Sequence, residues 1–125
     1  MVQSQPSPSV DMTAKWQEFI EQNVNSFIKW DLIRFFHDNP HIQDTADNIA
    51  GYIGRDPKRI VRELDGLVHV NVLLVNPQHD EKIYSLTDDS ETRELISGFV
   101  MACFDRNFRV KAIHHVIQGS GYKTN

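Results

Sequence analysis

A strong turn signal at residues 54–57 limits what this chain can fold into more than any other feature. Gly54 can end one helix in a left-handed conformation, and Asp56 followed by Pro57 can cap and open the next. Asp44 can cap the helix before the turn, and the buried side of that helix carries Ala46, Ile49, Ala50 and Ile53. The pattern therefore predicts a helix, a tight turn and a second helix.

The second of these helices, predicted from residue 57 to about 69, has an apolar side and a cationic side. At about 100° per residue, one face carries the apolar residues Ile60, Val61, Leu64, Leu67 and Val68. Roughly the opposite face carries the cations Arg55, Lys58, Arg59 and Arg62. Such a helix rests on a core and offers its cations to a partner, for which a phosphate backbone is the obvious candidate. The alternative is that this face of the helix is exposed to solvent and binds no partner, since Asp56, Glu63 and Asp65 lie beside the cations.

Two β-rich runs follow, over residues 72–75 and 82–87. Asn71 before them can take the left-handed conformation that ends the second helix. Residues 76–81 between the two runs are polar and contain a proline, so they predict a hairpin loop.

Helices are also predicted on both sides of this region. Residues 11–38 are mostly helical in pattern, with cap-forming side chains at Asn23, Asn25 and Ser26 that suggest a joint between two helices. Another helix begins near residues 88–91, and a polar interruption at 105–107 divides the last helical region. The fold class is therefore α+β, mainly helical with a small antiparallel hairpin.

The terminal helices hold more apolar side chains than one side of a small core needs. This excess favours a homodimer interface over a purely internal core. The interface residues predicted on this basis are Trp16, Phe19, Phe99, Phe104, Phe108, Ile113 and Ile117.

The length of 125 residues is that of one domain, predicted over 10–118, with a disordered tail at 1–9 and a flexible tail at 119–125. Neither a signal peptide nor a membrane span is expected. The single Cys103 excludes an internal disulfide framework and fits a reducing cytoplasm. The net charge of −4 counts against nucleic-acid binding, although the distribution of charge decides more than the sum.

The order of elements resembles the winged helix–turn–helix over roughly residues 26–104. Residues 45–54 resemble the first helix of that motif, residues 55–68 its recognition helix, and residues 84–87 the aromatic-x-Leu-Thr strand that closes the wing. The resemblance is closest to regulators of the multiple-antibiotic-resistance and arsenic-repressor types, which implies a homodimer that binds duplex DNA. Two departures matter: the predicted wing has Asp80 and Glu81 where cations are usual, and the following helix opens with acidic residues.

The sequence gives little support for an enzyme or a metal-binding protein. The six histidines lack zinc spacing, and Cys103 has no nearby thiol. The sequence contains no Gly-rich phosphate loop, no nucleophile elbow and no paired carboxylates in a plausible cleft, so we expect no catalysis, no cofactor and no metal.

These observations favour a homodimeric transcriptional regulator whose helix at about 57–68 enters the major groove of double-stranded DNA. The alternative is a winged-helix module that docks a protein partner and does not bind DNA. A small-molecule effector is also left open, because aromatic residues near the interface could line a pocket.

Overall fold

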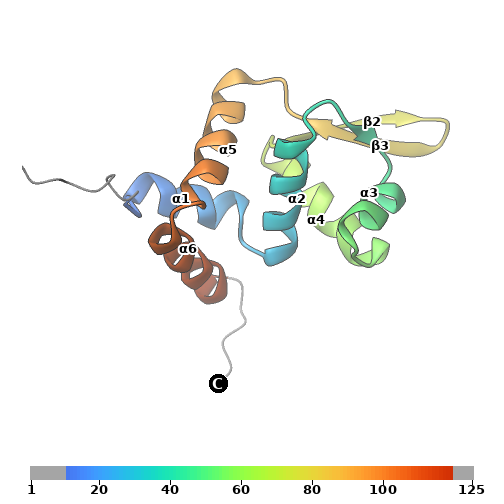
Figure 1. Ribbon diagram of the computed structural model, residues 1–125. Helices are drawn as coiled ribbons and strands as arrows, with labels where there is room; N and C mark the ends of the chain where they lie inside the picture. Colours follow the sequence, from blue (N-terminus) through green and yellow to red (C-terminus); the bar gives the residue numbers. More distant parts are fainter. Residues whose placement is uncertain (1–10, 120–125) are drawn as a thin grey trace, which may run out of the picture.

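The computed structural model describes residues 11–119 as six helices and one three-stranded antiparallel sheet (Figure 1). The elements in chain order are α1 (Ala14–Asn23), α2 (Phe27–Asp38), β1 (Gln43–Asp44), α3 (Ala46–Ile53), α4 (Pro57–His69), β2 (Leu73–Gln78), β3 (Glu81–Leu86), α5 (Ser90–Ala102) and α6 (Arg106–Gly119). The predicted mainly helical α+β class is confirmed. The predicted tails at 1–9 and 119–125 lie outside the described residues, except that Gly119 is the last residue of α6.

The predicted joint between the first two helices is confirmed. Ser26 caps α2 by accepting a hydrogen bond from the backbone N–H of Lys29 at 3.1 Å. Thr13 caps α1 in the same way through the N–H of Trp16. A side-chain oxygen at each start satisfies a backbone donor that the helix itself cannot.

The helix–turn–helix follows its sequence signals with one correction. Gly54 ends α3 with φ of 73°, Asp56 caps α4, and Asn71 after α4 has φ of 67°. The predicted cap Asp44 is wrong, because Thr45 accepts the hydrogen bond from the N–H of Asn48. Asp44 lies one residue earlier, in the short strand β1.

The sheet has the strand order β1-β3-β2, and β1 was not predicted. The loop predicted at 76–81 is also wrong, because β2 and β3 pair through Gln78 and Glu81 and leave a turn of only two residues. His79 and Asp80 both have positive φ, of 50° and 69°, which suits the tight turn between twisted strands. Pro77 is tolerated because β2 is an edge strand.

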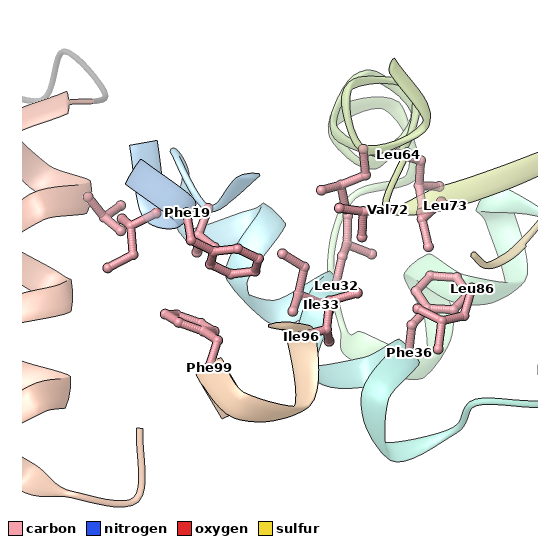
Figure 2. Packing of buried hydrophobic residues seen from close by; sticks show 14 of the residues in the cluster. Phe19, Leu32, Ile33, Phe36, Leu64, Val72, Leu73, Leu86, Ile96 and Phe99 are labelled. Atoms are coloured by element: carbon pink, nitrogen blue, oxygen red, sulfur yellow. The ribbon is translucent and has the colours of Figure 1, made fainter. Parts of the chain in front are cut away.

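One continuous apolar core joins the two halves of the molecule (Figure 2). Phe19 and Phe99 lie on one side of Leu32 and Ile33, and Leu64 and Leu73 lie on the other. Helix α2 runs between them and contributes the fully buried residues Leu32, Ile33 and Phe36. In Figure 1, α1, α5 and α6 accordingly lie on the other side of α2 from α3 and α4.

Part of the predicted dimer interface belongs to this core. Phe19, Phe99 and Phe108 are at most 5% exposed, so these three are corrected from interface residues to core residues. Their rings pack within the chain: the Phe19–Phe99 centroids are 5.3 Å apart and the Phe99–Phe108 centroids 6.1 Å. Trp16 packs edge-on against Phe108 and remains partly exposed.

Candidate nucleic-acid interface

Helix α4 places three cations on a free surface. Lys58, Arg59 and Arg62 are exposed, whereas the opposite side of the helix is fully buried through Ile60, Leu64 and Leu67. Within the part of the chain that the structure describes, none of the three cations makes a salt bridge. The buried stripe therefore fixes the orientation of α4 and leaves its cations available to a partner.

The carboxylates near these cations are held by other groups. Glu63 accepts a hydrogen bond from Ser26 Oγ at 2.7 Å, which ties α4 to the start of α2. Asp65 accepts one from the Tyr84 hydroxyl at 2.6 Å. Asp56 caps α4 through the N–H of Lys58 at 3.1 Å. Within the described residues, these carboxylates therefore form no direct ion pair with Lys58, Arg59 or Arg62.

Arg55 differs from the other three predicted cations. It lies in the turn before α4, and its Nε donates to Asp31 Oδ2 of α2 at 2.9 Å. Its side chain is about one-third exposed. The structure thus places Arg55 beside the α4 cations but gives it a partner, and this ion pair joins the turn to α2.

The contact between Tyr84 and Asp65 holds the hairpin against α4. Burial raises the pKa of the Tyr84 hydroxyl, and the hydrogen bond to Asp65 with its negative charge raises it further. The hydroxyl is therefore a permanent donor at physiological pH. Lys82 of β3 also reaches Asp65, with 3.4 Å between Nζ and Oδ2. These two contacts place strand β3 of the hairpin beside α4.

That tip is acidic. Asp80 and Glu81 are exposed, and together with Asp47 of α3 they line an open groove of about 370 Å³ between α3, α4 and the hairpin, in which Lys82 is the one cation. Val61, predicted on the buried side of α4, lies in this groove and is 38% exposed. The cationic face of α4 therefore ends at an acidic border on its hairpin side.

A second surface is formed by α6, the turn before it and the end of α5, on the other side of α2 from α4 (Figure 1). Phe104 is 74% exposed, and Ile113 and Ile117 are at least about one-third exposed. Val110 and Met101 are exposed as well, although they were not among the predicted interface residues. Val110 could have been found from its spacing, because it lies three residues before Ile113 and seven before Ile117. The opposite side of α6 is buried through Phe108, Ala112 and Val116, so this helix is apolar on two sides.

The described residues contain no helix long and apolar enough to cross a membrane and no group of three or more His, Cys, Asp or Glu placed to hold a metal ion. Comparisons with protein-family models, with curated proteins and with solved structures find no match to this chain.

Proposed function

We propose that this protein is a cytoplasmic DNA-binding transcriptional regulator of the winged-helix type that acts as a homodimer. In this proposal α4 enters the major groove, and Lys58, Arg59 and Arg62 contact phosphates or guanine edges. Arg55 acts at the entrance to the helix, where its ion pair with Asp31 fixes the turn. No catalytic step is involved.

One observation carries the proposal: three neighbouring cations lie exposed on α4 while the acidic residues of the same helix bind other groups. Exposed cations without an ion-pair partner can neutralise DNA phosphates. Each phosphate that is neutralised releases counterions from DNA, which favours binding. The order α2, β1, α3, α4 and hairpin is compatible with a winged helix, in which the second helix of the turn motif presents its outer face to the groove.

The acidic groove beside α4 supports the second candidate, a winged-helix module that docks a protein partner. Asp47, Asp80 and Glu81 would repel a phosphate backbone but attract a basic segment. The two candidates predict opposite responses to duplex DNA, so one titration separates them.

The test measures binding to mixed genomic duplex fragments as a function of salt. The wild-type protein should bind less tightly as salt rises, and the variant with Arg59→Ala and Arg62→Ala should bind much more weakly. The slope of log affinity against log salt should also flatten by about one unit for each phosphate that a subunit of the variant no longer neutralises.

A matched control removes two cations elsewhere, by Lys15→Ala and Lys111→Ala. Both side chains are exposed and lie on α1 and α6, so net charge changes equally while α4 is untouched. This control should retain nearly wild-type affinity. A wild-type protein without salt-sensitive affinity for duplex DNA would exclude the regulator and leave the docking module.

A further inference from the structure

The surface around α4 carries exposed charges of both signs next to one another. Lys58 and Arg62 are exposed on α4, and Asp47 and Glu81 are exposed along the groove between α3, α4 and the hairpin. Within the described residues, none of these four side chains forms a salt bridge. Lys82, the cation inside the groove, is already paired with a carboxylate of α4. A positive half and a negative half of one surface are therefore both available to a partner.

Val61 lies at the border between the two halves. At about 100° per residue, Lys58 and Arg62 lie about 40° apart around α4, and Val61 is turned about 60° from Lys58. Val61 lines the acidic groove and is exposed, so it lies on the groove side of these cations. An apolar centre with a charged rim is the usual arrangement of a protein interface. The five residues Lys58, Val61, Arg62, Asp47 and Glu81 are called the bipolar face below.

A surface with one positive half and one negative half is complementary to itself. A twofold axis through the border brings the positive half of each copy opposite the negative half of the other, so every attractive contact occurs twice. The same axis brings the two copies of Val61 together. A basic peptide would neutralise only the acidic half of the bipolar face, and DNA would neutralise only the cationic half. A second copy of the chain neutralises both.

From this charge complementarity we infer that the bipolar face binds the bipolar face of a second copy of the chain. Figure 1 shows α3, α4 and the hairpin on the other side of α2 from α6, so this contact is separate from the α6 surface. It joins chains, or dimers already paired through α6, into larger assemblies. The pairing itself does not depend on DNA binding. Its consequence rests on the proposed function: paired copies cover Lys58 and Arg62, so DNA must displace the second copy.

The test begins with sedimentation of the full chain, without DNA, at about 0.01 M and about 0.15 M salt, between which the screening length falls from about 30 Å to about 8 Å. The net charge of −4 makes copies repel each other more strongly at low salt. An attraction that grows as salt falls must therefore come from local charges. The Kd for self-association should be about tenfold lower at the lower salt concentration. Association through the apolar stripe of α6 should not weaken as salt rises.

Two charge-reversal variants identify the surface. Lys58→Glu with Arg62→Glu reverses the cationic half, and Asp47→Lys with Glu81→Lys reverses the acidic half. Each variant alone should lose the salt-sensitive association, because like charges then face each other across the twofold axis. A fluorescently labelled acidic-half variant should nevertheless bind the cationic-half variant, since opposite charges then meet at all four positions.

The matched control offers the labelled acidic-half variant a chain with Lys15→Glu and Lys111→Glu. This chain has the same net charge as the cationic-half variant, but its reversed residues lie on α1 and α6. It should not bind the labelled variant. Equal binding to both chains, retained salt-sensitive association in either variant alone, or a wild-type chain that binds an oligolysine peptide but not itself would overturn the inference. Salt-sensitive pairing by a protein without affinity for duplex DNA would exclude the proposed regulator and leave the inference intact.

Discussion

Asp44 accepts three hydrogen bonds at the point where β1 passes into α3. They come from the backbone N–H of Thr45 at 2.8 Å, from Asn48 Nδ2 at 2.7 Å and from the Tyr52 hydroxyl at 2.8 Å. Burial alone would raise the pKa of this carboxyl, but the three hydrogen bonds together lower it below its ordinary value. Asp44 therefore stabilises the fold in its ionised form.

Asp44→Asn should lower the free energy of unfolding at pH 7 by about 1 kcal/mol. Because the folded pKa is lower than the unfolded one, the stabilisation is complete above about pH 4 and is lost as the pH falls through the folded pKa. Urea unfolding at several pH values should therefore show wild type and variant converging in acid. A constant difference between them at all pH values would contradict this role.

Gly51 and Gly54 make a matched pair at the end of one helix. A Cβ at either position meets no atom within 4 Å, so only the backbone conformation distinguishes them. Gly54→Ala should destabilise by about 1 kcal/mol, because Gly54 has φ of 73°. Gly51→Ala, inside α3, should stabilise by roughly 0.5–1 kcal/mol. Thermal unfolding should shift in opposite directions, and shifts of the same sign would contradict the left-handed end of α3.

At the scale of the element, the buried face of α4 should contribute to stability and its exposed face to binding. Leu64→Ala should cost roughly 2–5 kcal/mol of stability, because Leu64 is fully buried and truncation leaves a cavity. Arg62→Ala on the exposed face should change stability by less than about 0.5 kcal/mol. Denaturant titrations of the two variants check this. A comparable loss of stability in both would mean that Arg62 has a structural role.

The hairpin tip should limit the affinity for DNA. Replacing Glu81 by Lys and Asp80 by Asn removes two negative charges beside α4 and adds a positive one. Asn is chosen for position 80 because that residue has φ of 69°, which Asn tolerates better than Lys. In the proposed regulator the double variant should bind duplex DNA more tightly and with a steeper salt dependence. Unchanged affinity in the titration would show that the tip faces away from the duplex.

The sequence predicts those elements whose ends depend on local chemistry. Ser26, Gly54 and the Asp56-Pro57 pair each act on backbone groups within a few residues, so their roles follow from the sequence without the fold. The strand β1 could not be predicted, because its two residues are defined by pairing with Tyr84 and Ser85, about 40 positions later. The prediction of a loop at 76–81 was wrong because Pro77 is unfavourable in a strand unless that strand lies at an edge.

The sequence predicted which residues form the candidate site, but it did not predict the hydrogen bonds and ion pairs that these residues make. Helical periodicity placed the cations of α4 opposite its apolar stripe. It could not show that Arg55 binds Asp31 or that Glu63 binds Ser26, since these contacts join distant parts of the chain. For the same reason, spacing alone did not separate the buried Phe99 and Phe108 from the exposed Phe104.

At the scale of the molecule, the exposed stripe of α6 predicts self-association. The protein should be a dimer by light scattering at micromolar concentration. Ile113→Glu with Ile117→Glu should produce a monomer with an unchanged fold, because both side chains are already partly in water. Lys111→Glu with Gln118→Glu is the control, since it adds acidic residues at exposed positions beside the stripe. A wild-type monomer at high concentration would contradict the proposed homodimer.

The two apolar sides of α6 have a consequence for dosage. One side is covered by the chain itself, so only an encounter with a second molecule can remove the other from water. Well below the concentration at which half of the chains pair, the number of dimers rises with nearly the square of the number of chains. In the proposed regulator, while most operators are free, a twofold change in expression would then change operator occupancy nearly fourfold, which would make the abundance of the protein a control on its own activity.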